Sequence, residues 1–276
     1  MKKRILILLT LTAIIAFSNT SMVFADGKTQ DIYEIYKSVG VTKAETEFEE
    51  QIRKNPLDGN AYSNMTRIYI EEKYPQKAID IAQKGIKTVP EYAYLYYNFI
   101  GLAYEGMGDF ENAINAYSKS IEILPSEPPY YNRGKLYGNK GEFKKAISDF
   151  TKAIDFVSDY KDNKELYQQR ISEIYWYRAS AYAEIGEYLN AVHDYDSILQ
   201  ISPSGDPDVY KYRAMAKISV CMQDNSVPDS EKNIIFNSAF DDLDSALKGY
   251  RETNNVKAYQ ETFELNKKLL NIFTKK

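Results

Sequence analysis

The sequence has one cysteine, one histidine and one tryptophan among its 276 residues. A lone cysteine cannot form a disulfide within the chain, so the fold must be held together by its core. Cys221 ends the apolar stretch 218–221, where a buried thiol is expected rather than a reactive one. The sequence also lacks Cys/His clusters with metal-ligand spacing and glycine-rich phosphate loops. We therefore expect no metal site and no cofactor.

Groups suited to catalysis are equally scarce. His193 stands beside Asp194, but the sequence places no nucleophile or second partner near it, and we interpret it as a solvent-facing or packing residue. The acidic cluster Asp241, Asp242 and Asp244 lacks the glycine and the terminal glutamate of a calcium loop and falls in an expected helix. A solvated helix face, with one of the carboxylates paired to an arginine, explains it better than a cation site. We predict no catalytic residue and no enzymatic activity.

Long apolar runs are absent after the first residues of the chain. Lys2, Lys3 and Arg4 precede the apolar run Ile5–Phe17, and Val23-Phe24-Ala25 follows a polar stretch. This order predicts a secretory signal peptide over residues 1–25, cleaved after Ala25. The alternative is an uncleaved membrane anchor, but the run is shorter than the roughly 20 residues of a spanning helix. We expect an exported protein (secreted, periplasmic or envelope-associated) without membrane insertion after cleavage.

The chain has no excess of positive charge. With 35 Lys and Arg against 39 Asp and Glu its net charge is −4. Signal cleavage would also remove the three positive charges of Lys2, Lys3 and Arg4, which leaves a net charge of −7. An acidic chain without a basic stripe is a poor nucleic-acid binder. The 44% of hydrophobic residues suffices for a sizeable core. The 25 tyrosines suit thin helical packing, because a tyrosine ring fills a gap while its hydroxyl stays at a wet edge.

An internal repeat organises what the sequence does contain. In residues 93–125 the apolar and aromatic positions recur at three and four residues, which predicts two helices, and Gly108 marks the turn between them. The pattern returns 33 residues later, and again after 45 more. The repeated positions are Tyr97, Gly101, Tyr104, Gly108, Phe110, Ala113 and Tyr117; Tyr130, Gly134, Tyr137, Gly141, Phe143, Ala146 and Phe150; and Tyr175, Ala179, Tyr182, Gly186, Tyr188, Ala191 and Tyr195.

This succession of aromatic, small, tyrosine, turn glycine, alanine and aromatic residues resembles the tetratricopeptide repeat. The resemblance implies an all-α fold, a right-handed α-solenoid of helix-turn-helix repeats spanning residues 26–276. The repeats cover residues 25–58 (degenerate), 59–92, 94–127, 127–160, 172–205 and 207–250, and a C-terminal capping helix covers 255–273. The polar, helix-prone insertion around 159–171 is interpreted as a lengthened helix pair.

Three successive copies share a pair of opposite charges. Each has an arginine three residues after its first tyrosine and an aspartate just before the large apolar residue of its second helix. The pairs are Arg133 with Asp149, Arg178 with Asp194, and Arg213 with Asp242. Earlier copies have neither charge. We infer an Arg–Asp salt bridge between the two helices of each of these repeats, in preference to an anion-binding site made of three arginines.

The resemblance also implies where a partner would bind. In this family the concave face is lined by the first helix of each repeat, at the residues one and five after the leading aromatic. Here these are Ser63 and Arg67, Asn98 and Leu102, Tyr131 and Lys135, Trp176 and Ser180, and Lys211 and Met215. We select Arg67, Asn98, Tyr131, Lys135, Trp176 and Lys211 as the candidate peptide-binding groove. Trp176 takes the outward-facing position, and Tyr175 the packed one.

The sequence therefore predicts a non-catalytic scaffold that binds an extended peptide or protein segment on its concave face. One alternative is an envelope assembly or chaperone-like factor, which would bind many clients transiently. The other is a carbohydrate or cell-wall binding module, because Tyr131 and Trp176 could stack on sugars. Lys135 and Lys211 beside these aromatics favour acidic or carboxylate-bearing segments. The oligomeric state is left open.

Overall fold

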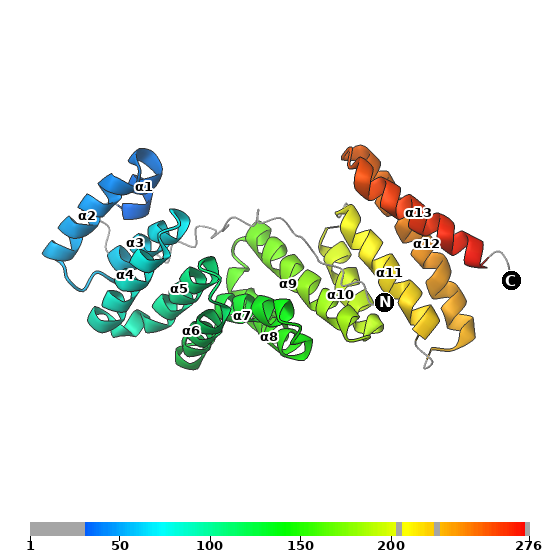
Figure 1. Ribbon diagram of the computed structural model, residues 1–276, viewed down its shortest axis with the longest axis horizontal. Coiled ribbons are helices and arrows are strands. Elements are labelled where there is room, and N and C mark those ends of the chain that lie inside the picture. Colours follow the sequence, from blue (N-terminus) through cyan, green and yellow to red (C-terminus); the bar gives the residue numbers. More distant parts are fainter. Residues whose placement is uncertain (1–30, 203–205, 224–226, 274–276) are drawn as a thin grey trace. The chain divides into compact units, whose positions relative to one another are not determined.

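The chain folds into α-helices joined by short turns (Figure 1). The computed structural model describes residues 31–202, 206–223 and 227–273, and within these ranges no β-strand occurs. The predicted signal segment 1–25 lies outside them. The chain divides into two compact units, whose boundary falls between Asp109 and Phe110. Each unit is described separately below.

In the first unit, successive helices pack side by side as antiparallel hairpins. Its helices are α1 (Ile32–Val39), α2 (Val41–Lys54), α3 (Gly59–Glu71), α4 (Pro75–Thr88) and α5 (Ala93–Gly106), with a 3-10 turn at Pro90–Tyr92. Helix α1 forms where the repeat pattern is weakest. The carboxylate of Asp31 accepts a hydrogen bond from the Tyr33 N–H at 2.9 Å and so caps its first turn.

The second unit contains three hairpins and a final helix. The hairpins are α7 (Glu127–Asn139) with α8 (Phe143–Phe156), α9 (Lys164–Glu184) with α10 (Tyr188–Ile201), and α11 (Pro207–Gln223) with α12 (Asp229–Glu252). Helix α6 (Phe110–Ile123) precedes them and packs on α7, and α13 (Val256–Phe273) packs on α12. A 3-10 turn covers Val157–Tyr160. Helix α9 begins inside the insertion, which therefore lengthens a helix.

The turns between paired helices share one backbone pattern. The turn glycines Gly108, Gly141 and Gly186 have φ of 76°, 77° and 81°, in the left-handed region that glycine occupies without steric cost. In each turn the N–H of the following residue donates to the carbonyl oxygen of the tyrosine at the end of the first helix, as from Glu142 to Tyr137 at 2.8 Å. Where glycine is missing, Lys73 takes the same conformation with φ of 60°.

The cores of the α7–α8 and α9–α10 hairpins are built from an alanine beneath a large aromatic ring. Ala146 and Phe150 of α8 are fully buried, as are Ala191 and Tyr195 of α10. A small residue at the helix crossing lets the two backbones approach, and the ring then fills the space beside it. Gly134 shows how close this approach is, because a Cβ atom there would lie 2.9 Å from the Phe150 ring.

Tyrosine hydroxyls at the edges of these cores bind carboxylates on neighbouring helices. Tyr33 and Tyr36 of α1 donate to Glu71 and Glu72 at the end of α3, at 2.7 and 2.8 Å. Burial and these hydrogen bonds raise the pKa of both phenols to about 12. The rings therefore fill gaps between helices while their hydroxyls join them.

Candidate functional site

The three Arg–Asp pairs lie within their hairpins as two-pronged ion pairs. In the Arg178–Asp194 pair the two N···O distances are 2.8 and 2.7 Å, and the Arg133–Asp149 pair has 2.8 Å for both. Arg213 contacts Asp242 in the same way, with Nε at 2.9 Å. All three carboxylates are buried. Burial alone would lower the pKa of each arginine, but the hydrogen bonds and charge of the partner carboxylate raise it on balance.

Each of these arginines also reaches back to the preceding hairpin or helix, a contact that sequence reasoning missed. Its Nη1 donates to the residue that follows the large aromatic of the previous second helix. The acceptors are Ser118 for Arg133 at 2.9 Å, Thr151 for Arg178 at 3.0 Å and Asp196 for Arg213 at 2.7 Å. The sequence did hold a signal for this contact, because Ser118, Thr151 and Asp196 occupy the same position in successive repeats. With both edges of each guanidinium engaged, an anion-binding site of three arginines is not supported.

Two of the six candidate groove residues belong to the first unit, and neither offers an open binding group. The guanidinium carbon of Arg67 lies 3.5 Å from the centre of the Tyr33 ring, and its Nε lies 3.1 Å from Glu71. Asn98 is buried, with 4% of its surface exposed. The expectation that Asn98 lines an open groove is corrected here, because α5 turns this side chain into the packing.

Tyr131 in the second unit is also buried, with 7% of its surface exposed. Its ring packs edge-on against Tyr177 at 5.7 Å, and the guanidinium carbon of Arg170 lies 4.5 Å from its centre. Burial raises the pKa of its phenol. Tyr131 therefore supports the surface from below and has no open ring face to stack on a sugar.

The cluster around Arg170 is a second feature that sequence reasoning missed. Its Nη2 lies 2.6 Å from the carboxylate of Glu127, which is 1% exposed, and its Nη1 lies 3.1 Å from Glu173. The Tyr160 hydroxyl donates to the second oxygen of Glu127 at 3.0 Å. Burial raises the pKa of Glu127, while the charge of Arg170 opposes that rise. The cluster fastens the insertion to the start of α7.

Lys135 differs from the other cations of the candidate groove. Its ammonium nitrogen lies 5.4 Å from the ring centre of Tyr131 and 6.0 Å from that of Tyr177. Its side chain is half-buried, and among the described residues no carboxylate forms an ion pair with it. A cation placed over aromatic rings without a counter-ion is suited to bind an incoming carboxylate.

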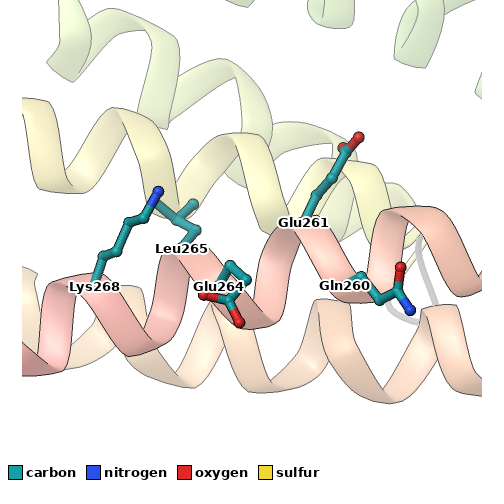
Figure 2. A pocket seen from close by; sticks show the side chains of 5 residues that line it. All are labelled: Gln260, Glu261, Glu264, Leu265 and Lys268. Carbon is teal, nitrogen blue, oxygen red and sulfur yellow. The ribbon is translucent and has the colours of Figure 1, made fainter.

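Lys211 is already paired. Its ammonium lies 3.6 Å from the carboxylate of Glu261 on α13. Glu261 belongs to a shallow concavity of about 470 Å³ along one face of that helix, where Figure 2 shows it with Gln260, Glu264, Leu265 and Lys268. The final helix thus supplies a counter-ion for the last candidate cation, and Lys211 is less available than Lys135.

Trp176, on the first helix of its hairpin, packs between two neighbouring hairpins. Its ring meets Tyr195 at 5.7 Å and Tyr212 at 5.2 Å, both edge-on. Tyr212 comes from α11, whose close packing on α10 brings that ring against the indole. Trp176 remains half-buried, so its fluorescence can report on binding at this surface.

The remaining candidates for chemistry are isolated. The side chain of His193 is 80% exposed, and its Nδ1 lies 4.0 Å from Asp194. The thiol of Cys221 donates to the Lys232 carbonyl at 3.2 Å, and burial raises its pKa. Within the described ranges no three His, Cys, Asp or Glu side chains gather as a metal site. None of the helices in these ranges combines the length and the apolar character needed to cross a membrane.

Comparison with known proteins agrees with the repeat pattern. A family model described as tetratricopeptide repeat matches residues 94–126 and 128–156. Serine/threonine-protein phosphatase 5 of Rattus norvegicus is 31% identical over 111 residues, which are 40% of this chain and 20% of that protein. The chain thus spans about a fifth of the length of this curated relative, and no activity follows from the match.

Solved structures share the fold at low sequence identity. YrrB, described as a tetratricopeptide-repeat protein with an unusual peptide-binding site, is 15% identical with a TM-score of 0.55, over 73% of this chain and 91% of that chain. MamA is 18% identical with a TM-score of 0.53, over 71% and 94%. The C-terminal part of a repeat protein from Cytophaga hutchinsonii is 17% identical with a TM-score of 0.55, over 87% and 92%. The predicted all-α class of tetratricopeptide-like helical repeats is confirmed.

Proposed function

We propose that this protein is a protein-binding scaffold whose partner segment docks on the first helices of the second unit, around Lys135. Arrays of helical repeats serve as binding scaffolds through the surface formed by successive helices. The observation that carries the assignment is Lys135 itself, a half-buried cation over Tyr131 and Tyr177 with no carboxylate partner among the described residues. The other candidate cations, Arg67 and Lys211, already have partners.

The chemistry of this place favours an extended segment that brings a carboxylate. A charge-assisted hydrogen bond to a partly desolvated ammonium contributes about 1.5–3 kcal/mol. The half-buried ring of Tyr177 on α9, whose centre lies 6.0 Å from the ammonium nitrogen, offers apolar contact beside it. A sugar-binding role receives less support, because Tyr131 is buried and Trp176 is packed edge-on between two tyrosines.

The test is a titration followed by the fluorescence of Trp176, the only tryptophan of the chain. The probes are a short peptide of alternating glutamate and valine and its counterpart with glutamine in place of glutamate. We expect the acidic peptide to bind, and Lys135→Met to weaken it about tenfold, or roughly 1.4 kcal/mol. The matched control is Lys144→Met, an exposed lysine on α8 of the same hairpin. Equal binding of the two peptides, or an unchanged affinity of Lys135→Met, would refute the site.

We also propose that the protein acts after export from the cytoplasm. The support is the order of basic, apolar and small residues over 1–25. Mass spectrometry of the protein isolated from its native cell should find a chain that begins at Asp26. An intact N-terminus would contradict the proposed cleavage. A chaperone-like role would be indicated if capture from that cell recovered many unrelated clients instead of a few partners.

A further inference from the structure

Helix α13 carries apolar side chains on two faces, of which one is buried and the other is partly exposed. Leu265 and Leu269 pack into a cluster with Ala214 and Ile218 of α11 and with Leu243 of α12. On another face, Val256, Phe263 and Leu270 follow one another at intervals of seven residues and are 58%, 48% and 47% exposed. Residues seven apart share one side of a helix. These three side chains form a second apolar stripe, about half of whose surface is exposed.

The exposed stripe borders a groove between the last two helices, which run side by side (Figure 1). The α12–α13 groove has a volume of about 410 Å³. Its apolar floor consists of Leu247 from α12 and of Tyr259, Phe263 and Leu270 from α13. Contiguous exposed apolar patches rimmed by polar residues often mark interaction sites.

The rim of the groove is positively charged. Lys248 and Arg251 of α12 stand on one side and Lys267 of α13 on the other, and no ion pair to any of the three forms within the described part of the chain. The one acidic group at the rim, Asp244, accepts from the side-chain amide of Asn266 at 3.4 Å. Arg251 donates to the Tyr259 hydroxyl at 3.1 Å, which orients its guanidinium at the groove. The rim thus stands out in a chain whose net charge is −4.

The packing of this unit indicates what shape fits the groove. The first helices α7, α9 and α11 are each covered by the helix that follows them in the chain. Helix α13 packs on α12 as α9 packs on α8 and α11 on α10, so it takes the place of a further first helix. A helix laid along the groove would cover Phe263 and Leu270 as the earlier second helices cover their own partners.

We propose that the α12–α13 groove binds an amphipathic helix of another protein, whose apolar face is flanked by carboxylates. The apolar stripe would supply the buried contact, and Lys248, Arg251 and Lys267 would pair with the flanking carboxylates. A second copy of this chain fits less well, because two-fold docking of the same patch would bring like-charged rims together. An anionic membrane fits less well, because the apolar residues lie in a groove, between Lys248 and Arg251 on one side and Lys267 on the other, instead of on a protruding face. The site is separate from Lys135 and does not rest on the function proposed there.

The test uses two designed helical peptides that share a leucine face. One has glutamates beside the leucines and the other has lysines at the same positions, and binding to the full chain is measured by calorimetry. We expect the acidic peptide to bind at least about tenfold more tightly than the basic one. Phe263→Ser, and separately the double change Lys248→Glu with Arg251→Glu, should each weaken it about tenfold.

Matched controls separate this site from general effects. Leu189→Ser removes a similarly exposed leucine from α10, and Lys144→Glu reverses an exposed charge on α8. Both variants should change the affinity for the acidic helical peptide by less than about twofold. The same is expected of Lys135→Met, because that change affects only the other site. Equal affinity for the two peptides, or wild-type affinity of both groove variants, would overturn the proposal. Dimerisation of the chain in light scattering, if Phe263→Ser abolishes it, would also overturn the proposal. So would binding of the chain to phosphatidylglycerol vesicles together with equal affinity for the two peptides.

Discussion

Removal of Asp194 tests whether the repeated ion pairs hold the hairpins together. Asp194 is 1% exposed and accepts from two nitrogens of Arg178. Asp194→Ala leaves that guanidinium inside the hairpin with Thr151 as its remaining partner, at 3.0 Å. Loss of one member of a buried ion pair costs about 3–5 kcal/mol. Because the Arg178 side chain keeps 14% of its surface exposed, we expect the lower end, about 3 kcal/mol.

Thermal and urea unfolding followed by circular dichroism measure this loss. In a chain of this size about 3 kcal/mol corresponds to a fall in Tm of roughly 6–12 °C. The control is Lys257→Ala, an exposed residue of α13, which should change the stability by less than about 0.5 kcal/mol. If Asp194→Ala shifts Tm no more than this control does, the pairs do not stabilise the fold.

A double-mutant cycle separates the ion pair from its surroundings. Replacing both partners, as in Arg178→Met with Asp194→Leu, leaves no unpaired charge in the hairpin. The double variant should therefore lose about 2 kcal/mol less than the sum of the two single variants. Additive losses would show that the two residues act independently.

Three further outcomes follow from individual residues. Gly141→Ala should destabilise the fold by about 1–2 kcal/mol because φ is 77° there. Gly138→Ala, inside α7, should be neutral or stabilising in the same urea titration, because a Cβ there would lie in ordinary van der Waals contact, 4.0 Å from the Cβ of Ala146. Thr262→Val should stabilise the chain by about 1 kcal/mol, measured by thermal unfolding, because the buried Thr262 hydroxyl has no hydrogen-bond partner in the described part of the chain. Burial raises the pKa of Cys221, so at pH 7 its thiolate fraction is smaller than that of a free thiol; labelling with a thiol reagent should be slower in the folded chain than in urea and should accelerate as the pH rises.

The fold could be read from the sequence because its signals are local and repeated. The tyrosine, glycine, alanine and aromatic positions of residues 93–125 each have a counterpart in two later copies, and the turn glycines permit the positive φ that each turn requires. The Arg–Asp geometry follows for the same reason, since two fixed positions of one hairpin must face each other. The contact from each arginine to the preceding second helix was missed, because it depends on how neighbouring repeats stack.

The candidate groove was harder to predict, because exposure depends on the neighbouring helix and not on position within the repeat. Tyr131 is covered by Arg170 and Tyr177, and Arg170 lies in an insertion that the repeat frame does not describe. Trp176 meets Tyr212 of the next hairpin, and Lys211 meets Glu261 of the last helix. Only Lys135 keeps both its predicted position and an unpaired charge among the described residues.

Site-specific photo-crosslinking in the native cell is the most direct test of the binding surface proposed around Lys135. A photoreactive residue at position 135 reports contacts on the first helix of the hairpin, and one at position 144 reports contacts on the second. We predict that position 135 captures a discrete partner protein and that position 144 does not. Capture of the same partner at position 144 alone, or at both positions to the same extent, would contradict the account.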